Sequence, residues 1–575
     1  MKNEIDSKIK HMSFRRIWPY FVIFTVALIY AIPQLHVRGI YVGADSAFHF
    51  NRAFEAMERI KNFNFHNTQM SLYGFNKSGR VVNALYGPGL GYFFGIILLL
   101  TKSWLKFQLI TNFILTIGSI GLSYWLFNKY SKQPFLSLVF AIVLSLTSPW
   151  SISYWYQSSG GMPWGMMFMP LVIDAGIQMY SNREKPVRIL RLGVIMALIL
   201  ESHMLSFVFG VSILSVFFIA GMITNPKRLQ LFKQSVVAAT ISLGLTLGYW
   251  SDYISIVHTQ NILSPFVNLN PANLSSNIFQ GLNFWLIVLS VTLIISFSGK
   301  LQNWQWIVFV TGIGFLIVAS GPKFILEHWN NIGFLRTVQF PMRFTLPGVY
   351  LLSFFVVTML SRFHDKSPQN KSYIIAIAVG VLLVSGSTIK NSFLNYYTVN
   401  QKFWQNPNYV TSKFSTSRNI TQTNIKKILE NRNDDFEKSI NVVNFSAPDY
   451  LPGRGQVYYE DANYRVIEKE IINPRIIVKK SLSKTGNLVV KWHQHKTHVT
   501  NLPIIVYRQS VVKLNGYKIT PEKNNNGVLK VIGNSGLNTV EVGIKVPKMV
   551  QIAKLGPIVV SVVVVGILIN SKRKR

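Results

Sequence analysis

Repeated apolar runs, each about seventeen residues or longer, constrain the fold of this chain more than any other feature of its sequence. A helix needs about 20 apolar residues to cross the hydrocarbon core of a bilayer. Because 49% of the 575 residues are hydrophobic and only 14% are charged, the runs predict a polytopic α-helical membrane protein. They cover residues 17–35, 107–127, 134–150, 163–180, 189–222, 234–250, 281–298, 304–319, 345–361, 373–388 and 554–570.

The run at 189–222 is roughly twice the bilayer length, so it predicts a hairpin that turns near Glu201-Ser202-His203 and brings the total to about twelve spans. The apolar segment 87–100 is short for a span, and the distribution of Lys and Arg decides how it is interpreted. If it does not span, the outer loops 151–162 and 251–280 carry no Lys or Arg, and the basic loops fall inside. We therefore expect a re-entrant or interfacial segment.

The spans divide the chain into three predicted parts. Residues 1–389 form a multi-span transmembrane module whose first outer loop covers 36–106. Residues 390–550 form an extracytoplasmic domain that is rich in β-strands and carries the hairpin signal Asn515-Gly516. Residues 551–575 form a final span and a basic tail. With both termini cytoplasmic, we expect a multi-pass protein of a bacterial plasma membrane.

The net charge of +36 has a local explanation. Basic loops face the cytoplasm and its anionic lipids, and the polar region near the C-terminus is rich in Lys. A nucleic-acid partner is therefore not inferred, and the lipid bilayer is the expected surrounding. The absence of Cys excludes disulfides, thiolate metal sites and thiol nucleophiles, which suits a bacterial surface protein.

The first chemical candidate is the stretch Gly43–Arg52, just beyond the first span. Asp45, His49 and Arg52 are spaced by four and three residues, so they share one face of a helix. They supply a base, a polar partner and an anion clamp at one bilayer edge. Helix capping by Asp45 is the alternative interpretation.

The helix expected at 46–63 is amphipathic. Apolar residues that include Phe48 and Phe54 are expected in the membrane interface. The polar residues of the same helix are expected in water: Asn51, Glu55, Glu58 and Arg59.

Further candidates lie in the other outer segments. Arg336 and Arg343 flank Gln339 in a basic outer loop, and arginine binds phosphate in a two-pronged fork. Anchoring of a helix end is the alternative for these arginines. Glu201, His203 and Asp252 are secondary candidates because they are ionisable groups in outer segments, and a simple turn is the alternative for Glu201 and His203. Tyr154 and Trp155 are secondary candidates in an uncharged loop, and an interfacial aromatic belt is the alternative for them.

The order of these features resembles the GT-C class of polyprenyl-phosphate-dependent glycosyltransferases, and within it the bacterial multi-spanning proteins of the YfhO type. Gln339-Phe340-Pro341-Met342-Arg343-Phe344 is similar to their QFPWRF signature, with Met in place of Trp, and Asp449-Tyr450-Leu451-Pro452 also resembles them. The resemblance implies that Asp45, the acidic residue of the first outer loop, is the catalytic base or positions the acceptor. The acidic pair of the metal-dependent members is absent from this loop, so no metal is inferred, and a divalent cation stays an open alternative.

These observations predict a membrane glycosyltransferase that moves a sugar from a polyprenyl-phosphate donor to a cell-envelope glycopolymer, a teichoic acid or an exopolysaccharide, on the outer face. Arg336 or Arg343 holds the donor phosphate, with Arg52 as a further candidate for this role. Asp45 takes the acceptor proton, and direct attack inverts the anomeric carbon. The alternatives are a transporter or flippase of a lipid-linked saccharide and a non-enzymatic envelope scaffold. A transporter predicts paired ionisable residues at mid-membrane and internal repeats, and the sequence offers neither convincingly.

Overall fold

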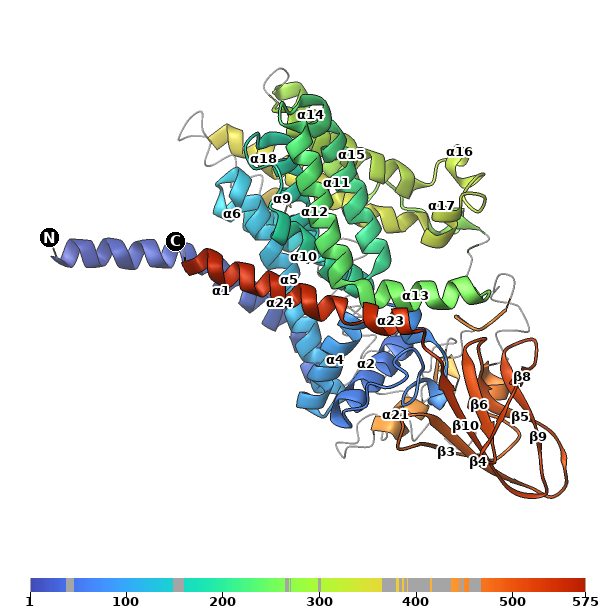
Figure 1. Ribbon diagram of the computed structural model, residues 1–575. Coiled ribbons are helices and arrows are strands. Elements are labelled where there is room, and N and C mark those ends of the chain that lie inside the picture. Colours follow the sequence, from blue (N-terminus) through green and yellow to red (C-terminus); the bar gives the residue numbers. More distant parts are fainter. Residues whose placement is uncertain are drawn as a thin grey trace.

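The computed structural model has a large helical part and a smaller β domain at one end (Figure 1). It describes residues 2–37, 46–147, 160–263, 268, 270–297, 301–364, 379–381, 385–386, 390, 394, 414–415, 436–442, 444–445, 449–453 and 467–573. Apolar helices and a C-terminal β domain confirm the predicted fold class.

Within the described ranges, six helices are long and apolar enough to cross a membrane, or seven if the bent pair α12–α13 is one span. The helical part contains α1 (Lys2–Val37), α2 (Ser46–Lys61), α3 (Val82–Leu85), α4 (Pro88–Thr101), α5 (Trp104–Ser131), α6 (Pro134–Thr147), α8 (Gly161–Met166), α9 (Met169–Ser181), α10 (Ile189–Ser202), α11 (Met204–Thr224), α12 (Arg228–Leu245), α13 (Leu247–Thr259), α14 (Gly281–Ser296), α15 (Asn303–Ser320), α16 (Lys323–Leu326), α17 (Gly333–Val338), α18 (Thr345–His364), α21 (Phe436–Val442), α23 (Lys548–Ala553) and α24 (Gly556–Arg573). The predicted run 373–388 lies mostly outside the described residues, so the total of twelve spans stays a prediction.

The predicted hairpin at 189–222 turns where the sequence indicates. Helix α10 ends at Ser202 and α11 begins at Met204, with the backbone of His203 extended between them. The imidazole Nδ1 of His203 accepts the amide hydrogen of Ser206 at 3.2 Å and so caps α11. The turn is therefore held by a side chain that the sequence pattern singled out.

The segment expected to be re-entrant or interfacial forms α4, a helix of 14 residues. Its length is about 21 Å, which is shorter than a hydrocarbon core of about 30 Å. Glycine lets α4 lie directly against α2, since a Cβ atom at Gly95 would be only 2.7 Å from the backbone nitrogen of Met57. Helix α4 is therefore the partner of α2 inside the folded loop.

Helix α2 corrects one expectation. Asn51, Glu55 and Arg59, expected in water, are each 2% exposed or less, and the apolar residues Phe48 and Phe54 are buried as well. The helix is enclosed because α4 and the rest of the first outer loop cover it. Its polar residues bind the backbone of that loop, a role that helical periodicity alone does not distinguish from solvation.

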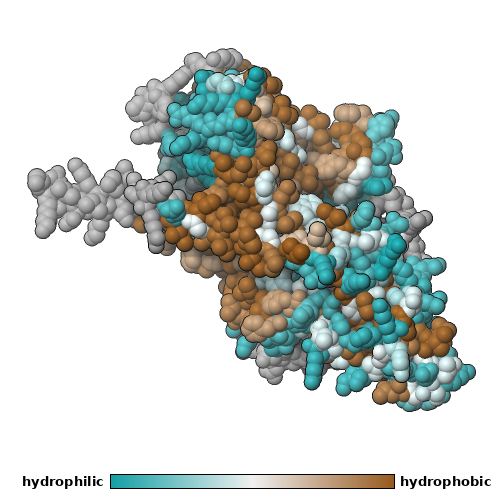
Figure 2. Space-filling model, viewed as in Figure 1, coloured by the Kyte–Doolittle hydropathy of each residue, from teal (hydrophilic) through white to brown (hydrophobic). Residues whose placement is uncertain are grey.

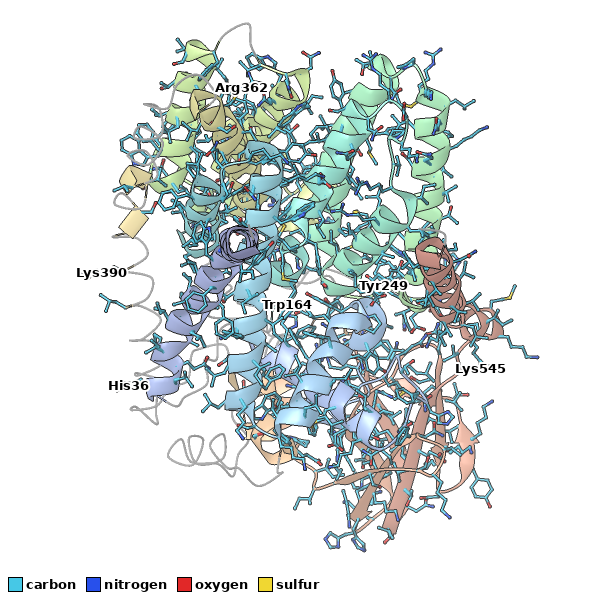
Figure 3. The ribbon with its side chains drawn as sticks, turned by 90° about the vertical axis from the view of Figure 1, so that its left-hand side faces the viewer. His36, Trp164, Tyr249, Arg362, Lys390 and Lys545 are labelled. Carbon is cyan, nitrogen blue, oxygen red and sulfur yellow. The ribbon has the colours of Figure 1, made fainter. Side chains whose placement is uncertain are left out.

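The surface agrees with a membrane protein. Figure 2 shows hydrophobic residues over the side of the helical part, with hydrophilic residues at its upper end and over the β domain. In Figure 3, Arg362 of α18 lies at the end away from the β domain, whereas His36 and Tyr249 lie nearer to it. The loop charges predict that Arg362 lies at the opposite end of the spans from His36 and Tyr249. Which end is cytoplasmic stays a prediction.

The β domain is a sandwich of two antiparallel sheets. One sheet has the order β3-β4-β10-β6-β7 and the other β5-β9-β8. Their inner faces bury a core that includes Val490, Trp492 and Ile504. The strands are β3 (Lys479–Leu482), β4 (Leu488–Gln494), β5 (His498–Ile505), β6 (Ser510–Leu514), β7 (Tyr517–Ile519), β8 (Glu522–Lys523), β9 (Val528–Gly533) and β10 (Gly536–Ile544), and the short pair β1 (Phe414–Ser415) and β2 (Asn444–Phe445) stands apart.

Hydrogen bonds join the β domain to the first outer loop. The side-chain amide of Asn67 donates to Asn487 Oδ1 at 2.8 Å, and the ammonium of Lys480 donates to the carbonyl of Asn76 at 2.7 Å. Arg80 donates to the carbonyl of Asp449, which starts a motif that the resemblance cited. The domain is thus docked on the loop that carries the first candidate residues.

Candidate functional site

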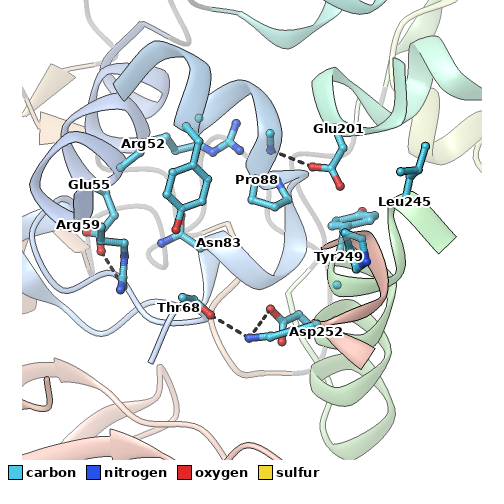
Figure 4. Close-up of a pocket in the computed structure, with 17 residues that line it drawn as sticks. Arg52, Glu55, Arg59, Thr68, Asn83, Pro88, Glu201, Leu245, Tyr249 and Asp252 are labelled. Carbon is cyan, nitrogen blue, oxygen red and sulfur yellow. Dashed lines mark hydrogen bonds and ion pairs between the residues drawn. The ribbon is translucent and has the colours of Figure 1, made fainter. Parts of the chain in front are cut away.

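A cavity of about 340 Å³ lies where the first outer loop meets the helical part (Figure 4). One wall is formed by α2 and α4, and the other by the end of α10, the bend between α12 and α13, and the start of α24. The charged residues of its lining are Arg52, Glu55, Arg59, Glu201, Asp252 and Lys554. Three of them, Arg52, Glu201 and Asp252, are candidates named from the sequence.

Arg52 is buried at the cavity wall, with 4% of its surface exposed. One terminal nitrogen donates to the carbonyl of Gly87, and the guanidinium lies 4.2 Å from the centre of the Tyr86 ring. The Nε atom is buried and has no hydrogen-bond partner among the described residues. Burial lowers the pKa of Arg52, yet a guanidinium stays charged in proteins, so this cation has spare capacity for an anion.

Glu201 faces the same cavity from the last turn of α10. Its Oε2 accepts the amide hydrogen of Gly89 at 2.8 Å, at the first turn of α4, where the helix dipole favours a carboxylate. A Cβ atom at Gly89 would lie 2.9 Å from Glu201 Cβ, so this close approach requires glycine. The carboxylate is thereby held in place without being neutralised by an ion pair in the described part of the chain.

Glu55 and Arg59 also line the cavity, but they neutralise each other. Their carboxylate and guanidinium are 2.9 Å apart, and both side chains are 2% exposed. Glu55 also accepts the amide hydrogens of Tyr73 and Gly74 at 2.7 Å, and Arg59 donates to the carbonyl of Met70 at 2.7 Å. This pair fixes the first outer loop on α2 and is not available to a substrate charge.

Asp252 is paired as well. Its Oδ2 lies 2.9 Å from the ammonium of Lys554, and its Oδ1 accepts a hydrogen bond from Gln69. Lys554 also donates to the hydroxyl of Thr68 at 2.8 Å. Asp252 therefore ties the segment between α23 and α24 to the first outer loop, and no sequence pattern indicated Lys554 as its partner.

A second cluster lies beside Arg52. The ring centres of His49 and Tyr86 are 5.6 Å apart, and those of Tyr86 and His203 are 6.5 Å apart. Burial, together with the charge of Arg52, holds the pKa of His49 well below its ordinary value, so His49 is neutral. Tyr86, which the sequence marked only as part of a return loop, connects the two histidines to the arginine.

The arginines of the later outer loop are arranged differently from the expectation. Arg343 donates to the carbonyl of Val338 and to Gln339 Oε1, each at 2.8 Å, and lies over the ring of Phe340 at 4.7 Å. These contacts hold its own turn, which was the alternative interpretation. Arg336 is exposed on α17, and neither arginine lines the cavity of Arg52.

Asp45, Tyr154 and Trp155 lie outside the described residues, so their predicted roles stay predictions. The sequence reasoning did not single out Tyr249, which lines the cavity beside Glu201 in Figure 4. Tyr249 lies three residues before Asp252 on α13, and residues three apart share one face of a helix. This spacing was the sequence signal that could have indicated Tyr249. Among the described residues, no three His, Asp or Glu side chains gather as a metal-binding group.

No protein-family model and no curated protein matches the chain. Its fold is similar to that of two solved GT-C glycosyltransferases. The oligosaccharyltransferase of Archaeoglobus fulgidus in its apo form is 11% identical with a TM-score of 0.40, over 73% of this chain and 61% of that one, which is less than two thirds of its length. ArnT from Cupriavidus metallidurans bound to undecaprenyl phosphate is 12% identical with a TM-score of 0.42, over 70% of this chain and 83% of that one. The GT-C class and the YfhO-like subgroup both stay predictions for this chain.

Proposed function

We propose that this protein is a membrane glycosyltransferase that uses a polyprenyl-phosphate-linked sugar, and that the cavity of Arg52 and Glu201 is its donor site. The observation that carries the proposal is the buried guanidinium of Arg52, which lines the same cavity as the half-buried carboxylate of Glu201 while neither has an ion-pair partner among the described residues. A buried cation without a counter-ion lowers the stability of a fold unless a ligand completes its interactions.

Arg52 binds the phosphate of the donor. A guanidinium gives a phosphate two parallel hydrogen bonds, and the surrounding low-dielectric wall strengthens them. The polyprenyl chain then extends between the apolar helices that border the cavity, which include α12 and α24. This assignment moves the phosphate site from Arg336 or Arg343, as the sequence suggested, to Arg52.

Asp45 acts as the base of the transfer, as its position in the sequence predicts. The acceptor hydroxyl oxygen forms a bond to the anomeric carbon, and Asp45 takes the hydroxyl proton. The bond from the anomeric carbon to the phosphate oxygen breaks, and the phosphate leaves with the electron pair. A single displacement of this kind inverts the anomeric carbon, and Glu201 orients sugar hydroxyls by accepting their hydrogens.

The acceptor is a glycopolymer of the cell envelope, and the reaction takes place on the outer face of a bacterial plasma membrane. The β domain, docked on the first outer loop through contacts such as that of Asn67 with Asn487, is the platform for it. A transporter or flippase is the second candidate, but no specific observation in the described residues favours it.

The proposal is tested with the purified full-length protein in lipid nanodiscs. Undecaprenyl phosphate is titrated, and its binding is followed by the shift in thermal stability. Arg52→Gln is expected to weaken binding about tenfold or more, because hydrogen bonds to charged groups contribute about 1.5–3 kcal/mol. Arg336→Gln, an exposed arginine away from the cavity, is the matched control and should bind as the wild type does.

Transfer is measured with an undecaprenyl-phosphate-linked radiolabelled hexose and an envelope fraction as acceptor. Asp45→Asn should abolish the release of undecaprenyl phosphate while leaving its binding unchanged. Full transfer by Asp45→Asn would show that its assigned role is wrong, and wild-type binding by Arg52→Gln would move the donor site away from this cavity.

A further inference from the structure

The outward face of the five-stranded sheet places lysines directly opposite one another. In the strand register, Lys479 of β3 pairs with Lys491 of β4, and Lys513 of β6 pairs with Lys518 of β7. All four residues are exposed. We call these four residues the lysine face.

This arrangement opposes the stability of the sheet. Like charges directly opposite on neighbouring strands are destabilising, and side chains of any uncharged polar type would solvate this face equally well. Glu541 of β10 lies directly opposite Lys513 in the strand register and forms an ion pair with it at 4.0 Å, so it offsets part of the charge of the second lysine pair. Between residues 467 and 546 the sequence has thirteen Lys and Arg and four Glu, without Asp.

The two lysine pairs are separated by β10. Neighbouring strands are about 4.8 Å apart, so the pairs lie roughly 10 Å from each other across the sheet, and the whole face is about 19 Å wide. One small anion cannot contact both pairs at this distance. A chain with repeating negative charges can.

The sheet that carries the lysine face is joined to the first outer loop next to a residue that lines the cavity. Asn67 contacts the sheet through Asn487 and through the amide of Ile544, at 2.8 and 3.2 Å. Thr68, the next residue, lines the cavity and binds Lys554. The sheet and the cavity wall are therefore connected through Asn67 and Thr68.

We propose that the lysine face binds a polyanionic stretch of the envelope polymer and presents it to the cavity. The proposal rests on the proposed function only in naming this polymer as the acceptor. It narrows the acceptor to polymers with repeating phosphate or carboxylate groups and disfavours a neutral polysaccharide.

The full-length protein in uncharged lipid nanodiscs is titrated with poly(glycerol phosphate), with a polyuronate and with neutral dextran, at low and at high NaCl. Poly(glycerol phosphate) or the polyuronate should bind, more weakly at high salt because exposed charges are screened, and dextran should not bind. Replacement of all four lysines by Gln should weaken polyanion binding about tenfold or more. Whichever polyanion binds more tightly identifies the anionic group.

The test variant combines Lys479→Gln and Lys491→Gln on the lysine face. The matched control combines Lys523→Gln and Lys530→Gln on the opposite sheet, so both double variants lose the same charge. Only the lysine-face variant should lose affinity, and its Tm should be equal to or above that of the wild type because a repulsive pair is gone. Equal losses in both double variants, or binding of dextran, would overturn the proposal.

Arg52→Gln separates this proposal from the proposed function. It should bind the polyanion as the wild type does while failing to bind undecaprenyl phosphate. Full polyanion binding by the lysine-face variant would contradict the role of the lysine face but not the glycosyltransferase proposal. Normal donor binding by Arg52→Gln would contradict the donor site but not the role of the lysine face.

Discussion

Two sets of charges lie on the walls of the same cavity and differ in how they are satisfied. Glu55 and Arg59 form a fully buried ion pair that also holds the backbone of the first outer loop. Arg52 and Glu201 each have one described backbone partner and no ion-pair partner in the described part of the chain, although the Nε atoms of Arg52 and Arg59 alike have no hydrogen-bond partner there. Burial of a charge by itself therefore does not mark a functional group, whereas a buried charge without a counter-ion is a candidate for one.

The same substitution on the two carboxylates gives the largest expected contrast. Glu55→Gln leaves Arg59 buried without its counter-ion, so the free energy of unfolding should fall by about 3–5 kcal/mol. Thermal unfolding of the detergent-solubilised protein measures this loss. Glu58→Gln is the control, because Glu58 pairs at 3.7 Å with the exposed Lys61. If the free energy of unfolding falls by less than about 1 kcal/mol for Glu55→Gln, the distinction between the Glu55–Arg59 pair and the set of Arg52 and Glu201 is wrong.

Glu201→Gln should instead leave the fold nearly intact. The amide oxygen of Gln still accepts from Gly89, and no ion pair of Glu201 in the described part of the chain is lost, so the free energy of unfolding should change by less than about 1 kcal/mol. Transfer should fall roughly a hundredfold, as when a positioned polar group is removed from an active site. Assays of release of undecaprenyl phosphate and of thermal unfolding on the same preparation test both expectations, and a stability loss equal to that of Glu55→Gln would contradict them.

A third expected effect concerns the contact between the segment that links α23 to α24 and the first outer loop. Lys554→Met removes the ion pair with Asp252 and the bond to Thr68, and should cost about 1–2 kcal/mol. The double variant with Asp252→Asn should lose little more, since the two residues act together. A double-mutant cycle by thermal unfolding measures this coupling, and strictly additive losses would contradict it.

The smallest expected effect is a dependence on pH from His49. Its pKa in the fold is well below the ordinary value of about 6.5, so the unfolded chain binds the extra proton first, and stability falls as the pH drops below about 6.5. The slope is at most about 1.4 kcal/mol per pH unit for one group. Thermal unfolding at pH 7.5 and 5.5 should show a smaller difference for His49→Asn than for the wild type, and an unchanged difference would contradict this origin.

Much of the fold follows from local pattern. The hairpin turn at His203, the short helix at 88–101 and the β-hairpin at Asn515-Gly516 lie where apolar length, loop charge and turn residues predict them. The polar face of α2 was wrongly placed in water. Periodicity identifies a polar face, but it does not tell whether water or the backbone of a covering loop lies against it.

The candidate site was predicted only in part. Arg52, Glu201 and Asp252 were named from the sequence and line one cavity, while Arg343, named with them, holds its own turn. The sequence determined which side chains have the chemistry of a base or an anion clamp and which segments lie at the same end of the spans. Which charges are neutralised depends on the tertiary structure, because the partners concerned are remote in sequence: Glu201 binds an amide 112 residues away, and Asp252 pairs with Lys554, which lies between α23 and α24.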